Sequence, residues 1–249
     1  MPNRAPHVGV ILSGCGVFDG SEIHEAVITM LALDQHGATY QCMAPNRAFI
    51  PINHVTRRPA EDESRNVLVE AARLARGRIV DVATVTPAQF DAFILPGGSG
   101  AARNLSTFEG EGPECRLDGH VMRVLSEAHK LGRPLGFICI APVVAARLFG
   151  RGEHPRLTVG KNPEMAHNME MMGAKHVLCG AGDYVLDERH RIISTPAYME
   201  ASSISEVFQG INRLIGKLLE LARPAPTVAV KPGIPGVPEA HPTIRPATP

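Results

Sequence analysis

The sequence contains no tryptophan, and aromatic residues make up only 4% of its 249 positions. A core therefore has to be built from Val, Ile, Leu, Ala and Met. The chain also lacks net charge, because 25 Lys and Arg residues balance 25 Asp and Glu residues. A chain with no net charge and no basic block is a poor binder of nucleic acid or of a membrane surface. No apolar run approaches 18 residues, so no segment is expected to span a bilayer.

Targeting and disulfide signals are missing as well. The first residues, Met1 to Pro6, lack the long apolar stretch of a secretory signal. The five cysteines are odd in number, include no CxxC pair and show no zinc-finger spacing with histidine. These absences predict a cytoplasmic protein with reduced thiols and no metal site. Apolar residues nevertheless reach 44%, which is enough for a full core and excludes global disorder.

Proline divides the chain into two parts. Eight of the 21 prolines lie between Arg223 and Pro249. Proline removes the backbone donors that regular structure needs and favours extended, solvated conformers. The sequence therefore predicts one domain over residues 1–222 and a disordered proline-rich tail over residues 223–249.

Within residues 1–222, short apolar runs alternate with helical patterns. Strands are expected at 7–12, 38–44, 90–95, 134–138, 157–159 and 176–178, with a hairpin at 184–193. Helices are expected at 21–35, 64–77, 118–131, 140–149, 163–172 and 202–221. This alternation predicts an α/β fold with a mainly parallel sheet covered on both faces. In such sheets ligands bind at the carboxyl ends of strands. The segments after Leu12, Leu95 and Ile138 should therefore converge on one crevice.

The sharp junction from Gly136 to Pro142 places Cys139 between a strand and a helix. The partial positive charge and free N–H groups of a helix start favour the thiolate, which is the reactive form of cysteine. Pro142 suits the first turn of that helix, where a missing N–H costs nothing. Cys139 is therefore a candidate nucleophile, and the alternative is a cysteine that only fills the core.

A glycine-rich loop, Ser13 to Gly20, lies between the first strand and the first helix. Its glycine spacing differs from the dinucleotide fingerprint, and no P-loop lysine follows it, so the sequence predicts no nucleotide cofactor. The loop leads into Glu22 and Glu25. Read alone, these two carboxylates are typical of a helix start, where acidic side chains favour the positive end.

A second turn, Pro96 to Gly100, follows a buried strand and offers successive backbone N–H groups. Such a turn can hold a carboxylate or a developing oxyanion, and it can equally be a plain flexible turn. Asn104 is expected to steady this loop. His54 is the histidine expected to reach the crevice, with an ordinary loop histidine as the alternative.

Together, these segments resemble the ElbB family, the isoprenoid biosynthesis (enhancing lycopene biosynthesis) proteins with an amidotransferase-like domain. The residues that carry the resemblance are Ile11 to Glu25, Ile52 to His54, Glu63-x-Arg65-Asn66, Leu95 to Gly98 and Gly136 to Pro142. The resemblance spans roughly Pro6 to Ala222. It implies the class I glutamine amidotransferase-like superfamily, to which the PfpI proteins belong, and a flavodoxin-like three-layer sandwich with a nucleophile elbow.

The resemblance also implies roles for individual residues. Cys139 takes the position of the nucleophile, and a glutamate of the first helix hydrogen-bonds it. The distance of twelve residues from Gly37 places that role on Glu25, with Glu22 in reserve. The amides of Gly97, Gly98 and Ile140 form the implied oxyanion hole.

At the level of activity, the resemblance implies a glutathione-independent, cofactor-free glyoxalase. It converts glyoxal or a related small dicarbonyl to the hydroxy acid, with a possible deglycase activity, a link to isoprenoid biosynthesis and assembly as a homodimer. Cys139 would attack the aldehyde, and Glu25, His54 or Glu22 would move the proton between the two carbons.

Two features depart from the superfamily. Ile140 stands where amidotransferases and many PfpI proteins carry a histidine, and Phe137 is bulkier than the residue usual two places before the nucleophile. No Cys-His-Glu triad follows from the motif, so amidotransferase and protease activities are not expected. The missing histidine favours a second hypothesis, a non-catalytic redox sensor or partner-binding protein in which Cys139 is an oxidisable thiol.

Overall fold

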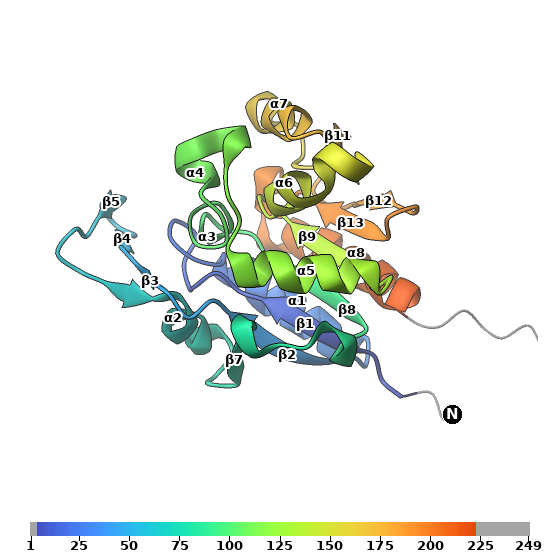
Figure 1. Ribbon diagram of the computed structural model, residues 1–249, viewed down its shortest axis with the longest axis horizontal. Coiled ribbons are helices and arrows are strands. Elements are labelled where there is room, and N and C mark those ends of the chain that lie inside the picture. The colour runs from blue at the N-terminus through green and yellow to red at the C-terminus, as the bar shows by residue number, and fades with distance from the viewer. Residues whose placement is uncertain (1–3, 223–249) are drawn as a thin grey trace, which may run out of the picture.

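A seven-stranded sheet forms the middle layer of the computed structural model, which describes residues 4–222 (Figure 1). Its strands are β1 (His7–Ile11), β2 (Thr39–Ala44), β7 (Ile79–Asp81), β8 (Ala92–Leu95), β9 (Leu135–Ile138), β12 (Val185–Asp187) and β13 (Ile192–Thr195). They are arranged in the order β12-β13-β9-β8-β1-β2-β7. All neighbours run parallel except β12, which pairs antiparallel with β13.

Helices cover both faces of this sheet. One face carries α1 (Ile23–Gln35), α2 (Val67–Leu74) and α8 (Ile204–Ala222). The other carries α5 (Gly119–Lys130) and α6 (Pro142–Glu153). The remaining helices are α3 (Gly100–Arg103), α4 (Phe108–Glu111) and α7 (Pro163–Met171), with 3-10 turns η1 (Val82–Thr84), η2 (Pro87–Gln89), η3 (Gly112–Glu114) and η4 (Ala197–Met199). The fold is the expected flavodoxin-like sandwich.

The sequence pattern explains these elements. Strands β8 and β9 are buried at every position, as expected for central strands that have helices on both faces. Helix α8 buries Val207, Ile211, Leu214 and Leu218, a stripe at helical spacing that faces the sheet. Helix α1 ends before Gly37, whose φ of +72° is a left-handed conformation that glycine adopts without strain.

The strand order reverses between β1 and β8, which run side by side. The chain proceeds outward from β1 to β2 and β7 on one side, and from β8 to β9 and β13 on the other. A crevice at the carboxyl ends of the strands is expected where such an order reverses. The loops after β1, β8 and β9 meet there, which is the convergence that the sequence predicted.

Several elements differ from the expectation. The predicted strands at 157–159 and 176–178 are short and form a separate sheet, β10 (Arg156–Leu157) with β11 (Lys175–His176). Strand β7 was not predicted. Helix α2 is shorter than its predicted range, because Asn66 caps its start by accepting a hydrogen bond from the backbone N–H of Val69. The proline-rich tail predicted at 223–249 lies outside the described residues.

The sequence also did not predict an arm at residues 48–66, which projects from the body of the molecule (Figure 1). It contains β3 (Ala48–Phe49), β4 (Ile52–Asn53), β5 (Arg58–Pro59) and β6 (Arg65–Asn66), paired as two small antiparallel sheets. Across the described part of the chain, no helix is both long enough and apolar enough to cross a membrane.

Candidate active site

Cys139 occupies a tight turn between β9 and α6. Its φ of +60° is unusual for a residue with a side chain and is held by the strand before it and the helix after it. The Cys139 N–H donates to the Thr195 carbonyl at 2.9 Å, which ties the turn to the neighbouring strand β13. Pro142 starts α6, as the sequence indicated. This geometry is that of a nucleophile elbow.

The thiol itself is buried, because only 7% of Cys139 is exposed. The side chain packs among buried residues at the start of α6. Burial raises the pKa of Cys139 well above its usual value, and the nearby Glu25 raises it further. The N–H groups of Gly98 and Ile140 act in the opposite direction. The Cys139 thiol is therefore shielded from bulk solvent.

Glu25 lies directly beside this thiol. Its side chain, from the first turn of α1, is fully buried and hydrogen-bonds Cys139. Its Oε2 accepts from the Gly97 N–H at 2.9 Å, and its Oε1 accepts from the Tyr198 N–H at 3.3 Å. Burial and the charge of Glu22 raise the pKa of Glu25 to about 8. At neutral pH this carboxyl is mainly protonated, so it can donate as well as accept a proton.

Glu22 has a different place. It is the N-cap of α1, where its Oε2 accepts from the Glu25 N–H at 2.7 Å. Its own N–H donates to the Gly97 carbonyl at 2.9 Å. Glu22 thus holds the start of α1 against the loop after β8 and acts on Glu25 through its charge.

The loop after β8 contributes to the site in a way that corrects the sequence prediction. Gly97, Gly98 and Ile140 were expected to offer three amides to an oxyanion. The Gly97 N–H is already bonded to the Glu25 carboxyl, so it positions the acid instead. The N–H groups of Gly98 and Ile140 remain directed at the Cys139 sulfur, where they favour negative charge.

Gly97 lies so close to this pair that a single methyl group would separate them. A Cβ at this position would stand 2.3 Å from the Cys139 Cβ and 2.5 Å from Glu25 Oε2. We expect Gly97→Ala to lower the reactivity of Cys139 toward iodoacetamide at least tenfold and to cost about 1–3 kcal/mol in unfolding free energy. The control is Gly110→Ala, whose Cβ would meet no atom within 4 Å. Equal reactivity of Gly97→Ala and wild type would contradict the packing described here.

His54 lies on the arm and contacts the arm and the loop after β1 rather than Cys139 or Glu25. Its Nδ1 lies 3.0 Å from the Ile52 carbonyl, and its Nε2 lies 3.8 Å from Asp19 Oδ1. The ring also packs against Phe18, with centroids 5.2 Å apart. Asp19 in turn accepts from the Ile52 N–H at 2.7 Å. His54 therefore fastens the arm to the loop after β1, and a role in proton transfer is not supported by these contacts.

Asn104 steadies a loop, but a different one from the loop expected. Its Nδ2 donates to the carbonyls of Ser13 and Asp19, at 2.8 and 2.7 Å. These carbonyls lie at the two ends of the glycine-rich loop after β1. The buried amide thus closes that loop, whose end packs against Gly98.

The sequence did not single out Tyr198, whose N–H bonds Glu25, or Thr195, whose carbonyl holds Cys139. Both follow or end β13, a strand that the sequence did predict as half of a hairpin. The rule that locates sites at the carboxyl ends of parallel strands would have pointed to them, had β13 been recognised as parallel to β9. Within residues 4–222, no group of three or more His, Cys, Asp or Glu side chains is arranged to hold a metal ion.

Comparison with known proteins places the chain among close relatives. It is 42% identical over 228 residues to the human glutamine amidotransferase-like class 1 domain-containing protein 3, mitochondrial, covering 89% of this chain and 85% of that protein. It is 40% identical over 227 residues to the rat ES1 protein homolog, mitochondrial, covering 88% and 85%. No family model matches the sequence.

Solved structures agree with these relatives. The isoprenoid biosynthesis protein with amidotransferase-like domain from Ehrlichia chaffeensis superposes with a TM-score of 0.80 at 34% identity, covering 86% of this chain and 99% of that one. Drosophila melanogaster DJ-1beta matches with a TM-score of 0.50 at 20% identity over 88% and 96% of the two chains, which is a likeness of fold.

These relatives correct one expectation. The sequence predicted a cytoplasmic protein from its reduced cysteines and from the residues at its start. The human, rat and zebrafish relatives are all named as mitochondrial proteins, which contradicts that prediction. Reduced thiols did not discriminate between these two compartments.

Proposed function

Because this chain belongs to the family of the mitochondrial ES1 and glutamine amidotransferase-like class 1 proteins, within the class I glutamine amidotransferase-like superfamily, we propose that it is a cofactor-independent glyoxalase. Its substrate is glyoxal or a related small dicarbonyl, and its product is the hydroxy acid. The observation that carries the proposal is the buried hydrogen bond between the Cys139 thiol and a carboxyl, Glu25, whose pKa is raised to about 8.

The reactive form of this pair holds one proton. Two groups that interact this strongly titrate as a unit, and the first proton leaves the pair rather than one residue. In the resulting monoanion, burial and Glu25 disfavour the thiolate, and the amides of Gly98 and Ile140 act against them, so a thiolate beside a carboxylic acid is the reactive minor form. Cys139 is then the nucleophile, and Glu25 carries the proton that the reaction needs first.

The chemistry follows from that state. The Cys139 sulfur forms a bond to one aldehyde carbon, the electron pair of the carbonyl moves to its oxygen, and that oxygen takes the proton of Glu25. The product is a hemithioacetal beside an ionised Glu25, which is now a base. Glu25 removes the hydrogen from the hemithioacetal carbon, which gives an enediolate, and returns a proton to the second carbon. The hydroxyl proton on the first carbon passes to the oxygen of the second carbon, and the first carbon becomes the carbonyl of a thioester. Water hydrolyses the thioester to glycolate and regenerates the thiol, so glyoxal and water are consumed without an oxidant.

The carboxyl beside Cys139 favours this proposal over a redox sensor. Oxidation of cysteine by peroxide depends on thiolate character and on exposure. Cys139 is 7% exposed and its pKa is raised, and both features lower its reactivity toward peroxide. Conversion of a dicarbonyl also requires a group that moves protons beside the sulfur, and Glu25 is placed for that role, whereas oxidation by peroxide needs no such group.

The direct test is the conversion of glyoxal to glycolate by the purified chain without glutathione. We expect kcat/KM to rise with pH through about 8, because the pair loses its first proton near this pH and both members are protonated below it. The rate should fall again when the second proton leaves and Glu25 can no longer donate. No glycolate, or a rate independent of pH between 6 and 9, would contradict the proposal. Rapid oxidation of Cys139 by peroxide without turnover would favour the sensor.

A further inference from the structure

One short segment holds both members of the reactive pair. Residues 195–198 begin with the last residue of β13, and the Thr195 carbonyl accepts the Cys139 N–H at 2.9 Å. Three residues later, the Tyr198 N–H donates to Glu25 Oε1 at 3.3 Å. The Gly97 amide holds the other oxygen of the same carboxyl. The position of the acid relative to the sulfur therefore depends on where this segment lies.

Residues 195–198 include a strained backbone conformation that the surrounding structure has to stabilise. Ala197 has a φ of +43°, a left-handed conformation for a residue with a Cβ, and its side chain is fully buried. Such a conformation costs about 1–2 kcal/mol and persists only where the surrounding structure enforces it. The turn at Ala197 is what directs the Tyr198 N–H back toward Glu25. Contacts that anchor Tyr198 are therefore the ones that can enforce it.

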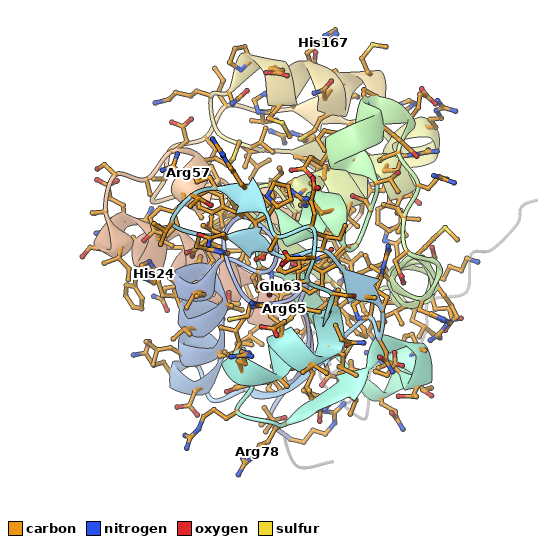
Figure 2. The ribbon with its side chains drawn as sticks, turned by 90° about the vertical axis from the view of Figure 1, so that its left-hand side faces the viewer. His24, Arg57, Glu63, Arg65, Arg78 and His167 are labelled. Carbon is orange, nitrogen blue, oxygen red and sulfur yellow. The ribbon has the colours of Figure 1, made fainter. Side chains whose placement is uncertain are left out.

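The anchor visible in the structure is a side-chain pair. The Tyr198 hydroxyl lies 2.7 Å from His24 Nδ1, and the two rings pack at a centroid distance of 5.8 Å. His24 is exposed and immediately precedes Glu25 in the first turn of α1. Figure 2 shows His24 at the outer edge of the molecule beside that turn. The contact thus joins η4 to the helix that carries the acid.

We propose that His24 and Tyr198 are positioning residues, and that their hydrogen bond lowers the pH at which the Cys139–Glu25 pair becomes reactive. With the Tyr198 amide in place, an ionised Glu25 gains a hydrogen-bond donor. The same contact holds a protonated Glu25 in position to donate to the thiolate. The singly ionised pair is therefore stabilised whether the charge lies on Glu25 or on Cys139. Loss of the His24–Tyr198 bond should move the first ionisation of the pair to higher pH.

Other titratable groups near the pair do not account for this effect. Glu22 is the other charged group that acts on Glu25, and it raises the pKa of that carboxyl from the N-cap of α1. Burial, with Glu22 and Glu25, raises the pKa of Tyr198, so its phenol stays neutral in the working range. A neutral His24 accepts from the phenol and a charged His24 donates to it, so the bond persists in either form.

The test is the rate of iodoacetamide alkylation at Cys139 against pH, measured by peptide mass spectrometry to separate this thiol from the other four cysteines. Tyr198→Phe removes only the hydroxyl, and His24→Leu removes its partner. We expect both to shift the midpoint upward by roughly 0.5–1 pH unit, which slows alkylation about three- to tenfold near pH 7 and leaves the rate at high pH unchanged. His24→Asn keeps a polar atom near the position of Nδ1, so its alkylation midpoint should lie closer to that of the wild type.

The matched control is His36→Leu. It removes a comparable exposed histidine bond at the other end of α1, where His36 Nε2 lies 3.0 Å from Asn212 Oδ1. An unchanged pH profile of alkylation in Tyr198→Phe would overturn the proposal. A fall in the alkylation rate by the same factor at every pH would also overturn it, because such a fall indicates a general loosening of the structure around Cys139. A shift of equal size in His36→Leu would overturn it as well. An effect of these variants on glyoxal turnover would rest on the proposed function. The alkylation assay uses no glyoxal, so it tests the positioning role even if the proposed function fails.

Discussion

Cys139→Ser is expected to abolish the consumption of glyoxal, with a loss of at least about a thousandfold in kcat. A serine hydroxyl at this elbow has no base strong enough to ionise it, because the adjacent carboxyl is itself mainly protonated at neutral pH. The amides of Gly98 and Ile140 would remain in place but would have no anion to stabilise. Glycolate formation and glyoxal consumption, followed on the same sample, measure the effect.

The same variant should fold. Serine preserves the small volume of the side chain, and its hydroxyl can hydrogen-bond Glu25 in place of the thiol, so the cost in unfolding free energy is about 1 kcal/mol. The control is Cys179→Ser, another buried cysteine, whose sulfur faces the Gly180 carbonyl and which should retain activity. Activity that survives in Cys139→Ser would remove this residue from the mechanism. A loss of several kcal/mol would indicate that Cys139 is mainly a core residue.

The layers of this fold are predictable because the sequence patterns that specify them, apolar runs and helical stripes, are local. The central strands β8 and β9 are short, wholly apolar runs that end at Pro96 or at the elbow, and α8 carries its apolar stripe over five turns. The hairpin at 184–193 was also recognisable from its sequence. Strand β7 was missed because its three residues are only half-buried and show no alternation.

The details of the site are less predictable because they depend on contacts across the sheet. The bond from the Tyr198 amide to Glu25 joins residues 173 positions apart. The role of the Gly97 amide depends on which carboxyl reaches it, and that depends on how α1 starts at Glu22. The convergence of strand ends placed Gly97, Gly98 and Cys139 near one another, and the family resemblance added Glu25, without deciding which amide served which group. The homodimer implied by the resemblance stays a prediction.

Glu25→Gln is expected to change the pH dependence of stability more than any other single substitution in the site. The pKa of Glu25 is about 8 in the folded protein and 4.5 in the unfolded chain. Because the folded-state value is raised, the protonated carboxyl contributes stability that is fully present below pH 4.5 and is lost as the pH rises through 8. A neutral glutamine does not carry this penalty, so its advantage over wild type should grow by about 1.4 kcal/mol per pH unit between these values.

Urea unfolding at pH 5 and at pH 8 measures this directly. We expect the difference in unfolding free energy between Glu25→Gln and wild type to increase by about 3 kcal/mol between the two conditions. Glu22→Gln keeps an oxygen to cap α1 and removes only the neighbouring charge, so it should reproduce a smaller part of the gain. A difference that is the same at both pH values would show that Glu25 is not buried in the protonated form.

The reactivity of Cys139 in the same variants separates the two roles of the carboxyl. Glutamine retains a hydrogen-bond donor for the thiolate, whereas leucine has none. Because Glu25 raises the pKa of Cys139, we expect both variants to lower this pKa and to speed alkylation by iodoacetamide near neutral pH, with the larger effect in Glu25→Gln, which keeps a donor for the thiolate. Both variants should lose glyoxal turnover, since neither can carry a proton between the two carbons. Identical alkylation profiles in all three proteins would refute the assignment, and a shift confined to Glu22 variants would transfer the role to Glu22.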